Sequence, residues 1–419
     1  MIYVNDCFFD ENFFERCNTA FDQHSIISQC KGRRIAVCMS DIATWIALCL
    51  YIKKKCGAVF PLPIDTPLAA AQERAKLAQC QYLIFGDDAT ASDDHCEMLM
   101  DATEVFSGSL IQMSSGTTGD PKIIERSWSS IDLEISSYIT EAFPEGNSMI
   151  PVVACPVNHS YGLICGVLVA LKRGVHPVIV SNNNPKYILK RIQSLESYIV
   201  YSSPVLLGAI AMLVEGKAPI KAVMTSGSVM QKPFFENLKL KVLNIYQQYG
   251  CSEVGCISLA KNISSENEVG NVLPHLKIYA GSNSDTPKEI VATLPDGNKV
   301  STCDLGFFDS NNILHFTSRI DDMINVSGFN VYPSEVENII LGMPNILDVV
   351  VFKRQHALGH DQVCLNYVSD VELLNSEIRQ WCKSRLSSHQ IPMVISSVDE
   401  IPRLPNGKVS RNKIADSLA

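Results

Sequence analysis

Short apolar runs alternate with amphipathic segments through most of the chain before residue 317. Runs rich in β-branched and aromatic residues occur at 82–85, 152–155, 178–180, 198–201 and 222–224, and helical patterns at 185–195 and 205–214. Strands that alternate with helices are typical of an α/β fold with mostly parallel sheets. The pattern therefore predicts a large N-terminal domain of such sheets flanked by helices.

The most apolar segment runs from Ile42 to Ile52, between Asp41 and three lysines. It is too short to cross a bilayer, which takes roughly 20 residues. It is predicted to be a buried helix that is capped by Ser40 or Asp41 and ends at Gly57. The acidic N-terminus also lacks the basic start of a signal peptide. We therefore expect a cytoplasmic protein without membrane insertion.

The pattern of apolar and polar residues changes after about residue 317. A helix is predicted from Pro333, strands at 347–352 and 363–368, a helix at 376–386 and a strand at 394–398. These elements make a small α+β unit. We place the boundary near Asp321, which gives a large domain over 1–320 and a small, mobile C-terminal domain over 321–419.

The amino-acid composition limits the kinds of partner that the chain is expected to bind. The net charge is −9, from 35 basic and 44 acidic residues, and an acidic chain is a poor nucleic-acid binder because phosphate neutralisation dominates that affinity. The 15 cysteines show neither CxxC nor zinc-site spacing, so they are expected to be free thiols in a reducing compartment.

The sharpest local signal is the segment MSSGTTGDPK at 113–122. Its first part consists of glycines and hydroxyl residues: Ser114, Ser115, Gly116, Thr117, Thr118 and Gly119. Such a loop offers backbone N–H groups and hydroxyls to a polyphosphate, and Lys122 adds a positive charge. Its spacing differs from that of a P-loop. A flexible linker is the alternative, but linkers usually lack the closing Pro-Lys.

This segment resembles the phosphate loop of the adenylate-forming superfamily, which comprises acyl-CoA and aryl-CoA synthetases, peptide-synthetase adenylation domains and firefly luciferase. Four further segments resemble that superfamily in the same order: QYGCSE at 248–253, STCDLG at 301–306, 318–337 and 401–411. The resemblance implies an enzyme that uses ATP and Mg²⁺ to convert a carboxylic acid into its acyl-adenylate.

Roles for single residues follow from the resemblance. Around ATP it places Tyr249 and Gly250, Ser252 near the phosphates, Asp304 on the ribose, Arg319 on ribose or phosphates, and Gly227 with Ser228 beside adenine. Glu253 would hold Mg²⁺ with ATP. Lys408 would be the catalytic lysine, Asp321 the hinge, and Gly328 and Phe329 the border of the thiol tunnel. Cys303 and Ser318 replace glycines of the superfamily pattern, with an effect on the backbone that the sequence does not decide.

The segment PVNHSYGL at 156–163 resembles the entrance of the acid pocket. It implies that His159 lies near the carboxylate and that Ser160 and Tyr161 begin the pocket wall. Further walls are expected at Ser203, Gly227 and Gly250. The segment holds no carboxylate to pair with a substrate ammonium, so an α-amino acid is disfavoured. Tyr161 suggests an aryl acid, and a fatty acid stays open.

The predicted function is that of an acid–thiol ligase, which forms acyl-AMP and then transfers the acyl group to a thiol. The thiol belongs either to coenzyme A, which the wording of 326–333 favours, or to the phosphopantetheine of a carrier protein acting in trans, which the compact chain suits. One alternative is a catalytically silent adenylate-binding regulatory protein, motivated by the lost glycines. A luciferase-like oxygenase is a weaker one.

Overall fold

The computed structural model describes residues 1–87, 96–100, 105–115, 121–181, 184–214, 218–228, 230–326, 329–355, 361–404 and 409–417. Six predicted site residues lie outside these ranges: Gly116, Thr117, Thr118, Gly119, Gly328 and Lys408. In the ranges given, no helix is long and apolar enough to cross a membrane.

The first sheet is built from residues 34–127. Its strands in spatial order are β6 (Cys96–Met98), β5 (Tyr82–Gly86), β3 (Arg34–Met39), β4 (Ala58–Pro61), β7 (Ser109–Ser115) and β8 (Pro121–Ser127). The four central strands are parallel neighbours, and β6 and β8 add antiparallel edges. Helix α2 (Ile42–Lys54) connects β3 to β4, as a parallel pair requires.

Helix α2 confirms the predicted buried helix, with one correction at its end. The Asp41 carboxylate caps it by accepting hydrogen bonds from the backbone N–H groups of Ala43 and Thr44. The residue with left-handed backbone after the helix is Cys56, at φ 59°, rather than Gly57. Gly57 is needed for a different reason, since a Cβ there would lie 2.5 Å from the Cys30 carbonyl oxygen.

A second sheet contains 13 strands among the described residues, and one half of it is parallel. This half consists of β13 (Val242–Cys251), β12 (Ile220–Thr225), β11 (Tyr198–Ser202), β9 (Ile150–Val153), β10 (Val178–Ile179) and β1 (Ile2–Val4), with β2 (Cys7–Phe9) antiparallel at the edge. Helices α6 (Pro185–Gln193), α7 (Pro204–Met212) and α8 (Lys232–Lys241) connect its strands. The α/β prediction is confirmed here.

The other half of this sheet is antiparallel, which the sequence analysis did not predict. In spatial order it contains β14 (Gly255–Lys261), β15 (Glu268–Val272), β19 (Leu314–Arg319), β18 (Lys299–Phe308), β17 (Lys288–Thr293) and β16 (Lys277–Tyr279). No helix separates these strands between residues 255 and 319. Parallel neighbours need a long crossover, so strands joined by short turns pair antiparallel.

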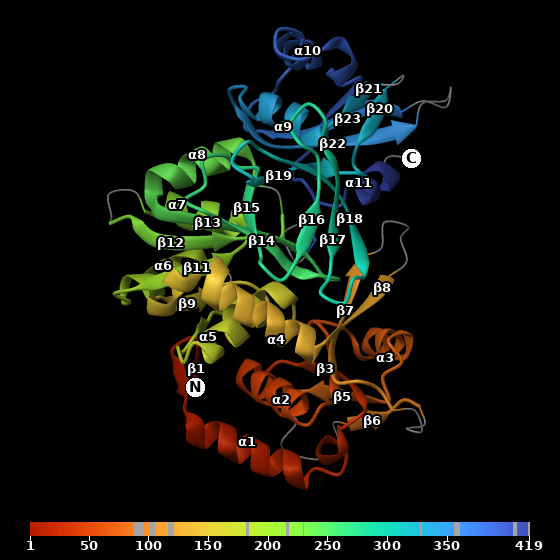
Figure 1. Ribbon diagram of the computed structural model, residues 1–419. Helices are drawn as coiled ribbons and strands as arrows, with labels where there is room; N and C mark the ends of the chain where they lie inside the picture. The colour runs from red at the N-terminus through yellow and green to blue at the C-terminus, as the bar shows by residue number, and fades with distance from the viewer. Residues whose placement is uncertain are drawn as a thin grey trace.

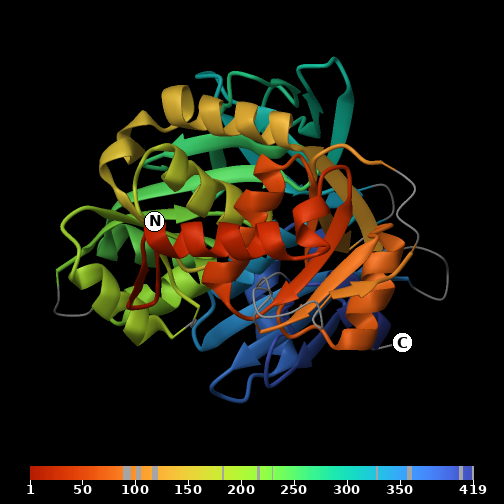
Figure 2. The ribbon, with the colours of Figure 1, turned by 90° about the horizontal axis from the view of Figure 1, so that it is seen from below.

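The main apolar core lies between the two sheets. Helix α2, helix α4 (Trp128–Ser137) with its π-helical extension η3 (Tyr138–Ala142), and the π-helix η5 (Tyr161–Leu168) with α5 (Val169–Lys172) share one cluster with β3 and β11. Helix α1 (Glu11–Gln23) covers α2 at the end of the molecule far from the C-terminus (Figures 1 and 2). Peripheral elements are α3 (Leu68–Leu77), η1 (Ile27–Gln29) and η4 (Pro144–Ser148).

The C-terminal region forms a separate α+β unit with its own core, at the top of Figure 1. It contains β20 (Ile324–Val326), β21 (Phe329–Val331), α9 (Pro333–Leu341), β22 (Ile346–Gln355), β23 (Asp361–Ser369), α10 (Asn375–Lys383), η6 (Ser388–Gln390), β24 (Val394–Ser397) and α11 (Arg411–Ser417). The predicted helices and strands are confirmed. The β20–β21 hairpin and α11 were not predicted.

Candidate active site

The turn between β13 and β14 is the centre of the candidate site. The strand register shifts between Tyr249 and Gly250, which marks a β-bulge. A Cβ at Gly250 would lie 2.0 Å from the Gly255 carbonyl oxygen, so only glycine allows the two strands to approach this closely. The turn beyond them carries Glu253, whose carboxylate therefore stands on a tightly constrained hairpin.

Two of the predicted nucleotide-binding motifs meet at this turn. The Lys122 Nζ, from β8 of the first sheet, donates to the Glu253 Oε1 at 3.2 Å. The two residues are 131 positions apart in sequence, and both side chains are accessible to solvent, at 63% and 29%. A cation and a carboxylate thus lie together where the sheets face each other, which suits a phosphate and its metal ion.

A buried ion pair lies beneath the same hairpin. The Arg126 Nη2 donates to the Glu134 Oε2 at 2.6 Å, and both side chains are nearly inaccessible. The Glu134 Oε1 accepts the Cys256 backbone N–H at 2.9 Å. Burial lowers the pKa of His275, whose charge also interacts with both members of the pair. The sequence analysis missed these residues, because nothing in the pattern distinguishes a buried charge from an exposed one.

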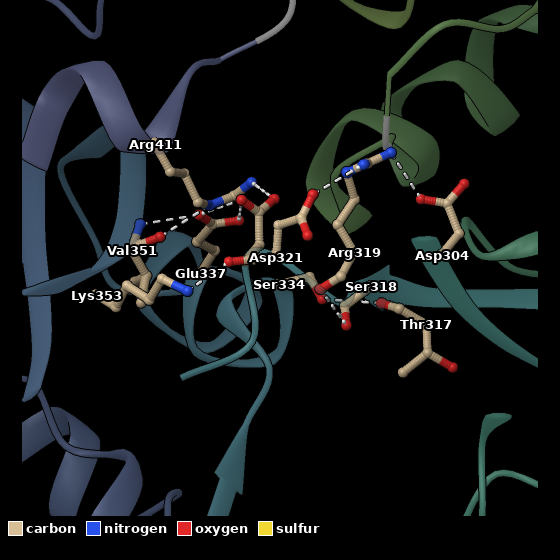
Figure 3. A network of polar contacts seen from close by, with 11 residues as sticks. Asp304, Thr317, Ser318, Arg319, Asp321, Ser334, Glu337, Val351, Lys353 and Arg411 are labelled. Atoms are coloured by element: carbon tan, nitrogen blue, oxygen red, sulfur yellow. Dashed lines mark hydrogen bonds and ion pairs between the residues drawn. The ribbon is translucent and has the colours of Figure 1, made fainter. Parts of the chain in front are cut away.

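Asp304, the predicted ribose ligand, is buried and already holds two partners. The Tyr249 hydroxyl donates to its Oδ2 at 2.7 Å. The Arg319 Nη1 donates to its Oδ1 at 3.1 Å, as Figure 3 shows. Burial, and then the charge of Asp304, raise the pKa of Tyr249 well above its ordinary value. Tyr249 therefore stays a neutral donor and fixes the orientation of the carboxylate.

Arg319 connects Asp304 to the predicted hinge. Its Nη2 donates to the Asp321 Oδ2 at 3.0 Å, and from the other side the Lys353 Nζ donates to the Asp321 carbonyl oxygen at 2.8 Å (Figure 3). Burial opposes the charge of Arg319, but Asp304 and Asp321 outweigh it and raise its pKa. Asp321 thus stands between a contact from the 13-stranded sheet and a contact from the C-terminal region.

The two lost glycines have different consequences. Cys303 adopts a left-handed backbone with φ 59°, where a residue with a Cβ is strained by about 1–2 kcal/mol, which explains the preference for glycine there. Ser318 lies within strand β19, is buried, and its hydroxyl donates to the Arg319 carbonyl oxygen at 3.3 Å. Neither replacement breaks the pairing of Asp304 with Arg319 across β18 and β19.

The predicted pocket walls gather at one edge of the parallel strands. Ser203 follows β11, Gly227 and Ser228 follow β12, and Gly250 lies near the end of β13. Gly227 has φ +90° and open space beside it. The carboxyl ends of parallel strands are the usual place for ligands in such sheets, and these residues lie at or near those ends.

The segment 159–161 opens the π-helix η5. His159 is exposed, and Ser160 and Tyr161 are half-buried. The Tyr161 hydroxyl donates to the Met224 carbonyl oxygen at 2.5 Å, which ties η5 to the end of β12. The Tyr161 ring lies 5.9 Å from that of Tyr201 on β11, so it stands against the same strand ends as the other walls.

A buried polar chain continues inward from Tyr201. Its hydroxyl lies 3.3 Å from that of Tyr138, which donates to the Gln248 Oε1 at 3.3 Å, and the Gln248 Nε2 donates to the Cys165 Sγ at 3.3 Å. Burial raises the pKa of the Cys165 thiol to about 12, so the chain is neutral. The sequence analysis did not single out any of these four side chains as site residues.

The chain is similar to known proteins over nearly its whole length. The family described as AMP-binding enzyme matches residues 107–286, and the AMP-binding enzyme C-terminal domain matches residues 335–408. A 3,4-dihydroxybenzoate–[aryl-carrier protein] ligase of Bacillus anthracis is 37% identical over 413 residues, which cover 98% of each chain. The chain belongs to the AMP-binding enzyme family.

More distant relatives agree with this assignment. A 2-succinylbenzoate–CoA ligase of Bacillus licheniformis is 25% identical over 73% of this chain and 69% of its own. In fold, this AMP-binding enzyme is similar to the o-succinylbenzoate CoA synthetase of Bacillus subtilis in complex with an acyl-adenylate, with a TM-score of 0.81, 18% identity, and 99% and 94% of the two chains covered. The predicted adenylate-forming superfamily and the predicted acid–thiol ligase class are confirmed.

The predicted thiol-tunnel residue Phe329 lies apart from the groups above, on β21 of the C-terminal region. Its ring is 59% exposed and stacks on His389, with 4.7 Å between the ring centroids. Among the described residues, those predicted for the nucleotide lie on β7 and β8, after β12, at the β13–β14 hairpin and on β18 and β19. Those predicted for the acid lie at the start of η5, after β11 and β12, and near the end of β13.

Proposed function

We propose that this AMP-binding enzyme activates a hydroxylated benzoate with ATP and transfers it to the phosphopantetheine thiol of an aryl-carrier protein in trans. The observation that carries this proposal is the 37% identity, over 98% of both chains, to the Bacillus anthracis ligase that acts on 3,4-dihydroxybenzoate and an aryl-carrier protein. The coenzyme A ligases of Bacillus licheniformis and Lactococcus lactis are 25% identical over about three quarters of this chain.

The polarity of the pocket wall supports a hydroxylated aryl acid over a fatty acid. Two tyrosines, Tyr201 and Tyr138, form with Gln248 and Cys165 the chain that begins beside Tyr161. A fatty acyl chain beside these groups would offer them no hydrogen bond, so it would gain nothing from their polarity. Ring hydroxyls donate and accept hydrogen bonds, so they match such a wall. Ser160, Ser203 and the turns at Gly227 and Gly250 complete the pocket.

The nucleotide is assigned to the groups around Asp304. Asp304 accepts the ribose hydroxyls, Arg319 contacts ribose or phosphates, and Tyr249 with Gly227 and Ser228 borders adenine. The phosphates take Lys122, Ser252 and the hydroxyl-rich residues 114–119. A carboxylate that two donors already hold in place is a preorganised acceptor, so the ribose meets a group that needs no rearrangement.

Glu253 fits the Mg²⁺ that accompanies ATP. Its carboxylate is partly exposed on the hairpin and lies beside Lys122, and Mg²⁺ prefers carboxylate oxygens together with phosphate and water. Among the described residues no group of three metal-ligating side chains occurs, and Glu253 is the carboxylate beside Lys122 that would hold the ion. When bound, Mg²⁺ would supply charge neutralisation to the phosphates.

Adenylation is a displacement at the α-phosphorus. A carboxylate oxygen of the acid attacks, the bond from phosphorus to the bridging oxygen of the β-phosphate breaks, and pyrophosphate leaves with that electron pair. His159 lies near the incoming carboxylate, and Lys408 stabilises the charge on the carboxylate and α-phosphate. In the second step the sulfur attacks the acyl carbon, AMP leaves, and the thiol proton is released.

The two steps use two orientations of a small domain. We assign residues 1–320 to the large domain and 321–419 to the small domain, with rotation at Asp321. The adenylation orientation brings Lys408 to the acid, and the second orientation brings Gly328 and Phe329 to the thiol path. Such movements of one domain over a fixed site are common in enzymes that exclude water.

Acid-dependent ATP–pyrophosphate exchange tests the first step. Dihydroxybenzoates should exceed benzoate, cinnamate and a fatty acid by at least tenfold, and a preference for the fatty acid would reject the pocket assignment. Absence of exchange with every acid would favour the silent adenylate-binding alternative. Lys408→Ala should abolish exchange and spare thioester formation from supplied acyl-AMP, because only adenylation uses the lysine.

The acceptor is tested with a phosphopantetheinylated aryl-carrier protein and with coenzyme A at equal concentration. Thioester should form on the carrier at least tenfold faster, as kcat/KM. Faster transfer to coenzyme A would overturn the carrier assignment and leave the adenylation assignment intact.

A further inference from the structure

Arg411 forms hydrogen bonds with three residues of the C-terminal region, and the proposed function leaves it without a role. It begins helix α11, and its Nε donates to the Val351 carbonyl oxygen at 2.9 Å. Its Nη1 donates to the Asp322 Oδ2 at 2.8 Å, and its Nη2 reaches both oxygens of Glu337, at 2.8 and 3.0 Å (Figure 3). One guanidinium thus joins α11, the residue after the proposed hinge, α9 and β22.

The chemistry of this cluster demands an arginine. Burial opposes the charge of Arg411, but Glu337 and Asp322 outweigh it and raise its pKa, so the group stays cationic. Glu337 is itself nearly buried and also accepts the Val351 backbone N–H at 2.8 Å. A lysine carries the same charge but lacks the planar fork that reaches several acceptors at fixed angles.

A second arginine holds the other side of the segment 405–408. Arg403 Nη2 forms an ion pair with the Asp348 Oδ2 at 2.6 Å, and residues Arg403 and Val409 form an antiparallel bridge. Asp348 and Val351 both lie on β22, three residues and therefore roughly 10 Å apart. Arg403, before the segment, and Arg411, after it, thus both contact strand β22.

The same strand also holds the proposed hinge. The Lys353 Nζ on β22 donates to the Asp321 carbonyl oxygen at 2.8 Å, and Arg411 holds the side chain of the next residue, Asp322. Strand β22 therefore contacts the hinge through Lys353. It also contacts Arg403, before the segment 405–408, and Arg411, after it. Apolar packing of Ile401 and Ile414 against its outer face adds a second, uncharged attachment.

We propose that Arg411 is a positioning residue for adenylation: it fixes the start of α11, three residues after Lys408 in the sequence, to Asp322 beside the hinge. Rotation at Asp321 would then carry this attachment point with it and present the lysine for the first step. This inference rests on the proposed role of Lys408. It makes Arg411 specific to the first half-reaction, because within the described part of the chain its hydrogen bonds go to Val351, Asp322 and Glu337 and none goes to β21 on the thiol side.

Arg411→Lys in the full-length enzyme tests the proposal. The kcat of ATP–pyrophosphate exchange should fall at least tenfold and up to about 100-fold, the effect of displacing a catalytic group by about 1 Å. The KM for ATP and for the acid should stay within twofold. Thioester formation from supplied acyl-AMP should also stay within twofold, which shows that the C-terminal region is folded.

A matched control is Arg379→Lys, because Arg379 also donates to a backbone carbonyl oxygen, that of Met393, but lies on α10 away from the hinge. It should leave exchange unchanged. Exchange within twofold for Arg411→Lys, or equal loss of both half-reactions, would overturn the inference. If Lys408→Ala itself retains exchange, the proposed function fails instead, so the two failures are distinguishable.

Discussion

The buried pair of Arg126 and Glu134 should make the hairpin that carries Glu253 depend on a charge that never contacts a substrate. In Glu134→Leu, Arg126 keeps its charge at 4% side-chain exposure without its counter-ion. Removing one partner of such a pair costs about 3–5 kcal/mol of the free energy of unfolding. The Cys256 N–H loses its acceptor as well.

Removing both charges should cost less than removing one. In Arg126→Met with Glu134→Leu, no buried charge is left unpaired, and mainly the Cys256 N–H stays unsatisfied, which costs about 1–3 kcal/mol. The double variant should therefore be more stable than Glu134→Leu alone by about 2 kcal/mol. A control is Glu145→Gln, because the ion pair of Glu145 with Lys261 is accessible to solvent on both sides, at 35% and 37%. This variant should change the free energy of unfolding by less than about 1 kcal/mol.

The assay is urea unfolding followed by tryptophan fluorescence, since Trp128 is buried two residues from Arg126, together with hydrogen exchange of residues 246–258. Exchange in that hairpin should accelerate in Glu134→Leu, and the Mg²⁺ concentration for half-maximal activity should rise as Glu253 loses its support. The reasoning is refuted if Glu134→Leu costs less than about 1 kcal/mol, or if the double variant is less stable than the single one.

Three further expectations concern single positions. Cys303→Gly should relieve the strain at φ 59° and raise the free energy of unfolding by up to about 1 kcal/mol, since the added backbone freedom of glycine offsets part of the gain; a loss of stability in urea would contradict this. Tyr161→Phe removes the bond to Met224 and should raise the KM for the acid about fivefold, from about 1 kcal/mol, with kcat within twofold; an unchanged KM speaks against a pocket role. Burial lowers the pKa of His275 in the folded protein, so as the pH falls the unfolded chain takes up the proton on this side chain at a higher pH than the folded protein does. The protein should therefore lose stability as the pH falls below about 6.5. Urea midpoints at pH 7.5 and 5.5 should differ more for the unmodified protein than for His275→Asn, and equal differences would exclude the effect.

The sequence predicted the elements whose signal is local. The spacing of apolar residues and the presence of capping residues predicted a set of elements that the structure confirms: helices α2, α6, α7, α9 and α10, and strands β5, β11, β12 and β22–β24. The order of the motifs also predicted the enzyme class. The antiparallel half of the large sheet escaped prediction, because short strands separated by turns give no periodic pattern that names their partners.

Contacts between distant residues were the other limit. Nothing in the pattern states that Lys122 meets Glu253, although each was predicted near the phosphates, because the fold alone brings β8 beside the β13–β14 hairpin. Arg126, Glu134 and Arg411 belong to residue types that usually lie on the surface. Their burial can be recognised only when the residues that pair with them are known. The role of Tyr138 was hidden in the same way, because its partners Tyr201 and Gln248 lie far away in the sequence.

The way in which Asp304 is held has a thermodynamic consequence. Each of its oxygens already accepts one hydrogen bond, from Tyr249 and from Arg319, and a carboxylate oxygen has room for a second one. An arriving sugar therefore adds its hydroxyls to a carboxylate that is already oriented, and little side-chain entropy is lost on binding. Discrimination against 2′-deoxyribose should be correspondingly strong, because a missing hydroxyl leaves one of these acceptor positions without a donor.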